Sequence, residues 1–120
     1  MTIARQKLGK DGENLACREL EDRGYEILAR RYRRRGGEID IIARDGATLV
    51  FVEVKTRDGR EFGDAAEAIT RWKRRRMART ALDYMMREHI SECPCRFDVV
   101  SIHVETGVPA IEIFQNAFDV

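Results

Sequence analysis

Hydrophobic positions near the start of the chain recur at the spacing of an α-helix. Leu8, Leu15 and Leu20 are interleaved with charged residues, which is typical of an amphipathic helix that buries one face. We expect Gly24 to end this helix, because glycine readily adopts the left-handed conformation that follows many helices. Residues 25–32 then predict a strand, which leads into a series of arginines and a Gly-Gly pair.

Alternating apolar and polar positions predict two further strands, at residues 38–44 and 48–56. The Asp45-Gly46 pair between them is a strong signal for a β-hairpin. In the second strand the valines share one face, and the other face carries Leu49, Phe51, Glu53 and Lys55. The hairpin therefore presents charged side chains on one side of the predicted sheet.

The second half of the chain predicts a long helix and two more strands. A helical pattern extends from Asp64 to about residue 92, with Glu67 placed to complete a capping box and Pro94 expected after its end. Its expected apolar face consists of Ile69, Trp72, Leu82, Met85, Met86 and Ile90. Residues 96–104 and 110–114 predict the last two strands, which are separated by a turn.

The predicted order is one helix, three strands, one helix and two strands, an α/β arrangement of type αβββαββ. The three consecutive strands form a β-meander, and the long helix leads in a right-handed crossover to a parallel fourth strand. We therefore expect a central mixed β-sheet flanked by helices. A chain of 120 residues without a linker is expected to form one domain, over residues 1–120.

Composition excludes several classes of protein. With 43% hydrophobic residues the chain can form a packed core, and no apolar run approaches the ~18–20 residues of a membrane span. The charged start of the sequence lacks a secretion signal, and three cysteines are an odd number for a disulfide scaffold. We expect a cytoplasmic protein with no membrane partner.

Basic residues are concentrated in two segments, although 22 lysines and arginines against 21 acidic residues leave a net charge of only +1. Residues 30–35 and 71–79 together hold half of the basic side chains, and most of these are arginines. Such runs often form solvated faces, but arginine also binds phosphate oxygens through its planar fork. A polyanion such as nucleic acid is therefore the expected partner.

The predicted hairpin brings acidic side chains together on one face of the sheet. A turn centred on the Asp-Gly pair places Asp40 opposite Phe51, and the same register places Glu38 opposite Glu53. Asp40 and Glu53 then become diagonal neighbours, with backbones roughly 7–8 Å apart. Two carboxylates at this separation can share a hard cation such as Mg²⁺, which completes its shell with water and phosphate.

Lys55 lies on the same face as Glu53, where its ammonium could hold a water nucleophile or stabilise charge on a phosphate. A metal ion, two carboxylates and a lysine suit the hydrolysis of a phosphodiester. The same alternation also describes any half-solvated strand, in which Glu53 and Lys55 form an ordinary surface pair. For Glu38, at the start of its strand, solvation or pairing with an arginine is the expectation.

Three segments together resemble the PD-(D/E)xK nuclease signature. They are Glu13 in the first predicted helix, the GEID segment at residues 37–40 and the FVEVK segment at residues 51–55. More narrowly, the chain resembles over nearly its whole length the YraN-type family of small bacterial predicted endonucleases, which are related to archaeal Holliday-junction resolvases. The resemblance includes the helix around Lys73 and the strand at residues 96–100.

The resemblance implies a restriction-endonuclease-like fold and a divalent-metal-dependent endonuclease acting on DNA, including branched or junction DNA. Asp40 and Glu53 correspond to the acidic residues of the motif, and Lys55 corresponds to its lysine. Glu13 matches a helical glutamate of resolvase-like members, so Glu13, Asp40 and Glu53 are expected to bind Mg²⁺ or Mn²⁺. Ile39 replaces the proline of the signature, at a position that binds no metal. A homodimer follows only by analogy with junction-cleaving enzymes.

The two basic segments supply the expected contacts to DNA phosphates. We assign this role to Arg33, Arg34, Arg35, Lys73, Arg74 and Arg76. One alternative function is a nucleic-acid-binding module that retains the nuclease fold without turnover. A structural partner of an acidic protein is a third interpretation of the same charges.

Several other side chains have simpler interpretations. Trp72 is expected to anchor the core rather than to stack on a base. Cys17 is expected to be a packing residue. A zinc site in the last third of the chain is disfavoured, because its Cys-Pro-Cys segment is tighter than the usual zinc knuckle. The residues concerned are His89, Cys93, Cys95 and His103.

Overall fold

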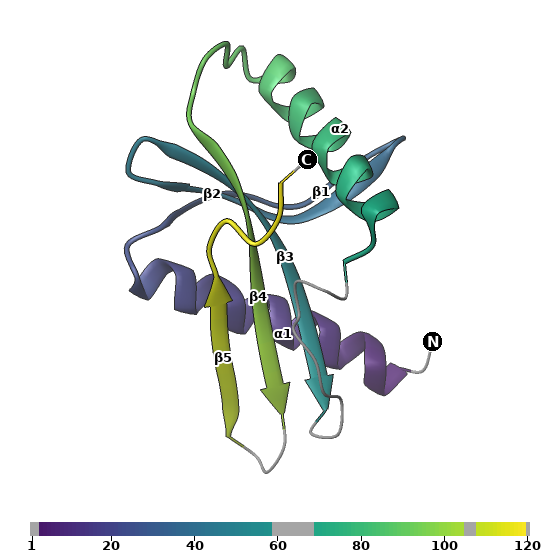
Figure 1. Cartoon of the computed structure of the whole chain (residues 1–120). Coiled ribbons are helices and arrows are strands. Elements are labelled where there is room, and N and C mark those ends of the chain that lie inside the picture. Colours follow the sequence, from purple (N-terminus) through teal and green to yellow (C-terminus); the bar gives the residue numbers. More distant parts are fainter. Residues whose placement is uncertain (1–2, 59–68, 105–107, 120) are drawn as a thin grey trace.

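The computed structural model describes the backbone of residues 3–58, 69–104 and 108–119, and within these ranges the side chains from residue 11 onward except that of residue 58. In this part of the chain, helices and strands follow one another in the predicted order αβββαββ, which is therefore confirmed (Figure 1). The elements are α1 (Ile3–Asp22), β1 (Glu26–Arg34), β2 (Gly37–Asp45), β3 (Thr48–Asp58), α2 (Arg71–Arg87), β4 (Cys95–Val104) and β5 (Pro109–Phe114).

The strands form one mixed sheet in the order β1-β2-β3-β4-β5. Neighbouring strands are antiparallel except β3 and β4, which are parallel because the chain passes through α2 between them. The predicted meander followed by a crossover strand is confirmed. In Figure 1 the β1–β2 ribbon crosses the upper end of the sheet next to α2.

Each helix packs against a different apolar cluster of the sheet. Cys17 and Leu20 of α1 lie in one buried cluster with Val100, which confirms Cys17 as a packing residue. Tyr84 of α2 lies in a second cluster with Phe51, and their ring centroids are 6.4 Å apart. Each such buried side chain contributes roughly 1.5–3 kcal/mol to stability. Neither helix of the described ranges has the length and apolar character needed to cross a membrane.

The C-terminus of α1 confirms the role expected for Gly24. This glycine has φ +93°, and its N–H donates to the carbonyl of Glu21 at 2.9 Å. The N–H of Tyr25 donates to the carbonyl of Leu20, also at 2.9 Å. This Schellman arrangement satisfies the last carbonyls of the helix and turns the chain into β1.

The C-terminus of α2 has the same hydrogen-bond pattern without a glycine. His89 takes φ +56°, and its N–H donates to the carbonyl of Met86 at 3.2 Å. The N–H of Ile90 donates to the carbonyl of Met85 at 2.8 Å. The helix therefore ends at Arg87 rather than near residue 92, because the left-handed histidine turns the chain before Pro94 is reached.

The N-terminus of α2 also differs from the prediction. Thr70 is the N-cap, and its side-chain oxygen accepts a hydrogen bond from the backbone N–H of Lys73 at 3.1 Å. The helix thus begins at Arg71. The predicted cap Asp64 and its partner Glu67 lie outside the described residues.

The buried face of α2 differs from the apolar face expected from sequence. Trp72, Leu82 and Met86 are 66%, 61% and 76% exposed, so the prediction that Trp72 anchors the core was wrong. The helix instead buries a narrow stripe of Met77, Thr80, Ala81 and Tyr84. Thr80 is tolerated there because its hydroxyl donates to the carbonyl of Arg76 at 2.9 Å. A stripe of this width leaves most of the helix surface free for charged side chains.

Candidate active site

The β2–β3 hairpin has a register two residues away from the predicted one. Asp45 pairs with Thr48 around a two-residue turn, and Ile42, rather than Asp40, lies opposite Phe51. The turn lies one residue further along the chain because Gly46 takes φ +61° at its first position, as in type II′ turns. A shift of two residues keeps the side chains of the paired residues 41–45 and 48–52 on their predicted faces.

The pairing between β2 and β3 ends just before the two acidic residues. Its last pair is Ile41 with Val52, and the predicted pairing of Asp40 with Phe51 was wrong. Continued beyond this pair, the register would bring Asp40 level with Glu53, and the negative charge of Glu53 does act on Asp40. The two carboxylates therefore lie close together where the two strands separate.

β2 leaves β3 at Asp40, and this separation opens the site. Across from Asp40, Arg31 of β1 has φ +51°, and the neighbours Ile39 and Ile41 point into different apolar clusters. The regular alternation of the ribbon is thus interrupted at this point. The Asp40 carboxylate accepts a hydrogen bond from the N–H of Val54 at 2.8 Å. This bond holds the carboxylate against the part of β3 that no longer pairs with β2.

The environment of Asp40 favours its protonated form. Burial raises the pKa of Asp40 to about 8, the negative charge of Glu53 acts in the same direction, and the Val54 N–H opposes both. Two neighbouring carboxylates that cannot both ionise easily are a frequent feature of functional sites. A cation between them would remove the repulsion.

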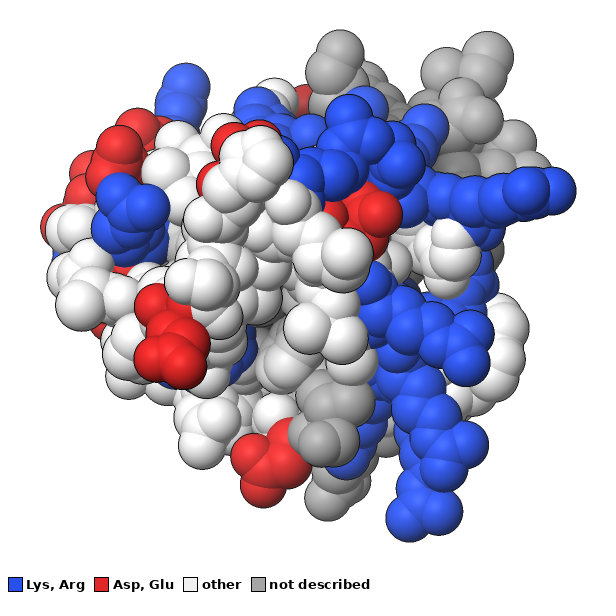
Figure 2. All heavy atoms as spheres, turned by 90° about the horizontal axis from the view of Figure 1, so that it is seen from above, with Lys and Arg blue, Asp and Glu red and all other residues white. Residues whose placement is uncertain are grey.

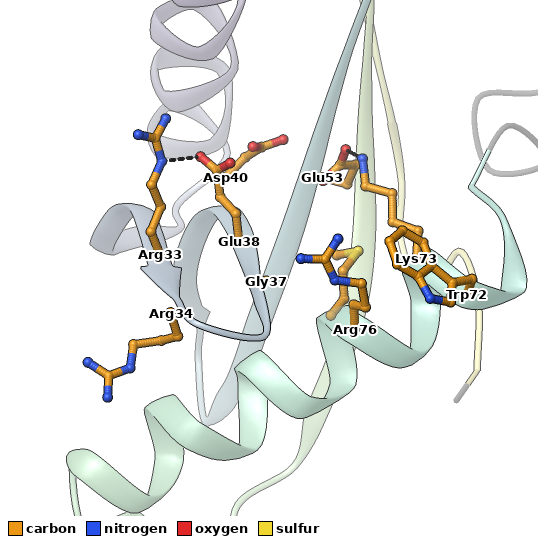
Figure 3. A pocket seen from close by; sticks show the side chains of 10 residues that line it. Arg33, Arg34, Gly37, Glu38, Asp40, Glu53, Trp72, Lys73 and Arg76 are labelled. Carbon is orange, nitrogen blue, oxygen red and sulfur yellow. Dashed lines mark hydrogen bonds and ion pairs between the residues drawn. The ribbon is translucent and has the colours of Figure 1, made fainter.

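Glu53 is surrounded by two lysines from different elements. Its side chain is almost completely buried, and Lys55 Nζ lies 3.7 Å from its Oε1. Lys73 Nζ of α2 contacts the same oxygen (Figure 3). Burial lowers the pKa of Lys73, but the contact with Glu53 outweighs it and the net pKa is raised. Burial and the nearby ammonium of Lys73 lower the pKa of Lys55.

Glu13 is paired with an arginine beside the two carboxylates. Its Oε2 accepts from Arg31 Nη2 at 2.7 Å and from Arg31 Nε at 2.8 Å. Gly12 lets α1 approach β3 at this point, because a Cβ there would overlap the hydroxyl of Thr56. Among the described residues, no three His, Cys, Asp or Glu side chains are grouped closely enough to hold a metal ion. Asp40 and Glu53 are therefore considered as a pair of possible oxygen donors.

A cleft of about 500 Å³ opens above the two carboxylates, between the β1–β2 ribbon and α2. Its walls combine basic, acidic and aromatic side chains. They are Arg33, Arg34, Gly37, Glu38, Asp40, Glu53, Trp72, Lys73, Arg76 and Met77. Figure 2 shows lysines and arginines gathered over one half of this end of the molecule, around a small acidic area. The arrangement is a positively charged rim around a carboxylate pair.

Several of the predicted phosphate contacts lie in the walls of this cleft. Arg33 pairs with Glu38 at 3.0 Å, in agreement with the expectation that Glu38 meets an arginine. Arg34 pairs with Asp83 at 2.9 Å. The Nε of Arg76 donates to the carbonyl of Gly36 at 2.8 Å, which links α2 to the turn after β1. The rim is thus held in place from both sides of the cleft.

Arg35 and Arg74 lie outside the cleft. Arg35 lines a smaller hollow of about 210 Å³ together with Arg79. The Nε of Arg74 donates to the carbonyl of Ile69 at 3.0 Å, and its guanidinium lies 5.2 Å from the ring centroid of Phe118. Arg74 therefore helps to hold the C-terminal segment, a role that the sequence did not indicate.

The matched part of the chain covers all of these site residues. Residues 12–102 match the model of an uncharacterised protein family described as UPF0102. The chain belongs to this family. The family is consistent with the YraN-type resemblance.

UPF0102 relatives from several organisms match almost the whole chain. The UPF0102 protein of Geobacter metallireducens is 44% identical over 119 residues, which are 99% of this chain and 98% of the relative. That of Symbiobacterium thermophilum is 48% identical over 114 residues, or 94% of this chain and 97% of the relative. That of Nocardia farcinica is 50% identical over 115 residues, or 95% and 91%. The relatives support the family, and their names state no activity.

Two residues of the site have contacts that the sequence did not indicate. Lys73, which is expected to bind phosphate, contacts Glu53, from which it is separated by 20 residues of chain. Trp72 was placed in the core, but it forms part of the cleft wall. Both positions depend on where α2 begins and how it crosses the sheet, which periodicity alone does not determine.

Proposed function

We propose that this protein is a divalent-metal-dependent endonuclease that hydrolyses phosphodiester bonds of DNA, including branched or junction DNA. The observation that carries the proposal is the closeness of Asp40 and Glu53 at the base of an arginine-lined cleft, with two lysines at Glu53. Burial and the negative charge of Glu53 raise the pKa of Asp40, and such a carboxylate pair fits a hard cation, because Mg²⁺ commonly uses one or two carboxylates.

The donor set fits the metal that the resemblance implies. Asp40 and Glu53 would hold Mg²⁺ or Mn²⁺, which when bound supplies Lewis-acid stabilisation of the scissile phosphate. Glu13 would adjust the position of Arg31 beside the site rather than bind the metal directly in the arrangement described. The alternation of charge from acidic centre to basic rim suits a phosphate backbone that crosses the cleft.

We assign the two lysines different roles in the proposed reaction. Lys55 has a lowered pKa, so its amine is the better candidate to orient a water nucleophile or accept its proton. Lys73 neutralises Glu53, and on binding of substrate its ammonium is within reach of a phosphate oxygen at the same point. Arg33, Arg34 and Arg76 in the walls would grip neighbouring phosphates through charge-assisted hydrogen bonds.

A catalytically inactive nucleic-acid-binding module is the second candidate. It is favoured by the lack, among the described residues, of a three-carboxylate group. Such a module would bind DNA with strong dependence on salt, would lose binding when Arg33 or Arg76 is replaced, and would be indifferent to Asp40→Asn. The two candidates differ only in turnover, so cleavage decides between them.

The test is cleavage of branched, single-stranded and duplex DNA with Mg²⁺ or Mn²⁺ by the wild type and three variants. Glu53→Gln and Lys55→Ala are each expected to reduce the rate by about 10²–10⁴-fold. Glu38→Gln is the matched control, because Glu38 lies in the same cleft but is paired with Arg33. Cleavage that survives both Glu53→Gln and Lys55→Ala would remove this assignment, and no cleavage of any substrate by the wild type would favour the binding module.

A further inference from the structure

Trp72 occupies an unusual place for a tryptophan. It is 66% exposed, it lies in the first turn of α2, and it forms part of the cleft wall immediately next to Lys73. Tryptophan is the largest apolar side chain, and leaving it exposed forgoes the stabilisation that burial provides. Leu82 and Met86 of the same helix are also exposed, but they do not line the cleft.

The Trp72 ring is fixed in orientation by an arginine. The guanidinium carbon of Arg76 lies 4.6 Å from the ring centroid, a distance at which a cation interacts favourably with an aromatic face. Arg76 is itself held by its hydrogen bond to the carbonyl of Gly36, and Figure 3 shows it extending from α2 toward Gly37. One face of the indole is therefore covered by a fixed cation, and the exposed fraction leaves the other face accessible.

We propose that the free face of Trp72 is a stacking site for one unpaired nucleobase of the nucleic acid in the cleft. The inference rests on the proposed function, since it takes the cleft to bind a phosphate backbone. Aromatic rings stack on nucleobases of any sequence, and the arginines beside the ring suit the phosphates that flank such a base. Lys73, the next residue, reaches Glu53, so the base would lie close to the phosphate above the carboxylate pair.

The site specifies the class of substrate. In a continuous duplex every base is stacked between its neighbours, and its face cannot reach a protein side chain unless the base is flipped out. A single strand, a flap or an unpaired nucleotide at a branch presents that face without this cost. The protein would therefore prefer nucleic acid with unpaired bases over blunt duplex of the same length.

The sequence provides a direct probe, because Trp72 is the only tryptophan of the chain. The experiment measures its fluorescence in the full-length protein with EDTA, so that no metal supports cleavage. The titrants are a single-stranded oligo(dU), an oligo(U) of equal length and a blunt DNA duplex of equal length, at one salt concentration. We expect quenching by a single strand at concentrations at which bound duplex leaves the emission unchanged. The single strand that reaches half of its full quenching at the lower concentration carries the preferred sugar.

Variants separate stacking from general electrostatic binding. Trp72→Ala, measured by anisotropy of a labelled oligonucleotide, is expected to weaken single-strand binding by roughly 5- to 150-fold and to leave duplex binding unchanged. Trp72→Phe is expected to restore most of the affinity, because it keeps an aromatic face. Leu82→Ala is the matched control, an exposed apolar residue of the same helix outside the cleft wall.

The outcomes distinguish this inference from the proposed function. Quenching by single strands without metal-dependent cleavage would support the stacking site at Trp72 and contradict the proposed nuclease activity. Cleavage with equal quenching by single strand and duplex, or an equal effect of Trp72→Ala on both, would overturn the base site and retain the nuclease. Lack of any quenching by bound single strand would also overturn it.

Discussion

Two clusters of buried charged side chains differ in how completely the fold satisfies them. Near the β2–β3 turn, the fully buried Asp98 accepts hydrogen bonds from Tyr25 Oη at 3.1 Å, Arg96 Nε at 3.0 Å and Asn116 N–H at 2.9 Å. Arg96 also donates to Asp45 at 2.7 Å. Burial lowers the pKa of Arg96, but its carboxylate partners outweigh burial and the net pKa is raised. Every charge in this cluster has an opposite charge beside it.

At the base of the cleft, the charges of the two carboxylates are less completely compensated. Asp40 accepts a hydrogen bond from Val54 N–H, but it also faces Glu53, and its pKa is raised. The Asp98 cluster is a structural feature whose charges the protein neutralises by itself. The Asp40 cluster retains a repulsion that a bound cation would relieve, and such unrelieved groups are characteristic of sites that bind or react. This difference can be tested by stability measurements alone.

The largest effect is expected in the structural cluster. Asp98→Ala removes the carboxylate that holds Arg96 and Tyr25, so it should lower the free energy of unfolding by about 3–5 kcal/mol. Urea denaturation measures this loss. Asp119→Ala, an exposed acid near the same C-terminal segment, serves as the control. A loss below about 1 kcal/mol would show that the network is not structural.

A metal ion should stabilise the cleft cluster specifically. At 100 times its Kd, Mn²⁺ is expected to raise the free energy of unfolding by about 2.7 kcal/mol at pH 8. Glu53→Gln should lose most of this gain, whereas Glu38→Gln should keep it, because Glu38 is paired with Arg33 outside the carboxylate pair. Denaturation with and without Mn²⁺ gives the comparison. Equal stabilisation of both variants would place the metal elsewhere.

The pH dependence of stability should reveal the repulsion at Asp40. The folded pKa of about 8 lies above the ordinary value of 3.8, so the folded state holds this proton more tightly than the unfolded state. The resulting stability is present below about pH 4 and is lost as the pH rises toward 8. Asp40→Asn lacks this loss and keeps an acceptor for the Val54 N–H. Without metal it should gain on the order of 1–3 kcal/mol relative to the wild type between pH 5 and 8.

That gain is measured by urea denaturation at both pH values in EDTA. The matched control is Asp45→Asn, which affects a carboxylate bound to Arg96 in the other cluster. Parallel pH profiles of the wild type and Asp40→Asn would contradict the raised pKa.

The smallest effect is expected at the N-terminus of α2, which positions Lys73. Thr70→Ala removes the side-chain acceptor of the Lys73 N–H and should cost about 1 kcal/mol. Thr70→Ser keeps the hydroxyl and should restore the stability. Thermal denaturation of both variants tests the cap, and equal melting temperatures of Thr70→Ala and the wild type would rule it out.

Some features of the site were predictable from sequence because they depend only on alternation. Asp40, Glu53 and Lys55 were placed on one face, and this survived an error in register because the shift was by two residues. The register itself was wrong, since it depends on which residue of the turn takes a positive φ. Gly46 takes it at the first turn position, so the turn consists of Gly46 and Ala47 instead of being centred on Asp45 and Gly46.

Features that depend on tertiary packing were not predictable. The end of α2 is set by His89 in a conformation that usually signals glycine, so no local pattern marked it. The contact of Lys73 with Glu53 and the exposure of Trp72 both follow from the narrow stripe that α2 buries. Charged and aromatic residues on such a helix have no periodic signature of their own.

The close contact between the start of β2 and α2 depends on Gly37 having no side chain. A Cβ at Gly37 would lie 2.8 Å from the hydroxyl of Thr80 and 3.5 Å from the carbonyl of Arg76, so only the Thr80 hydroxyl approaches the start of β2 too closely to admit a side chain. Even a single methyl group at this position would force Thr80 to move. It would disturb the hydrogen bond from Thr80 to the carbonyl of Arg76 in the helix that carries Lys73.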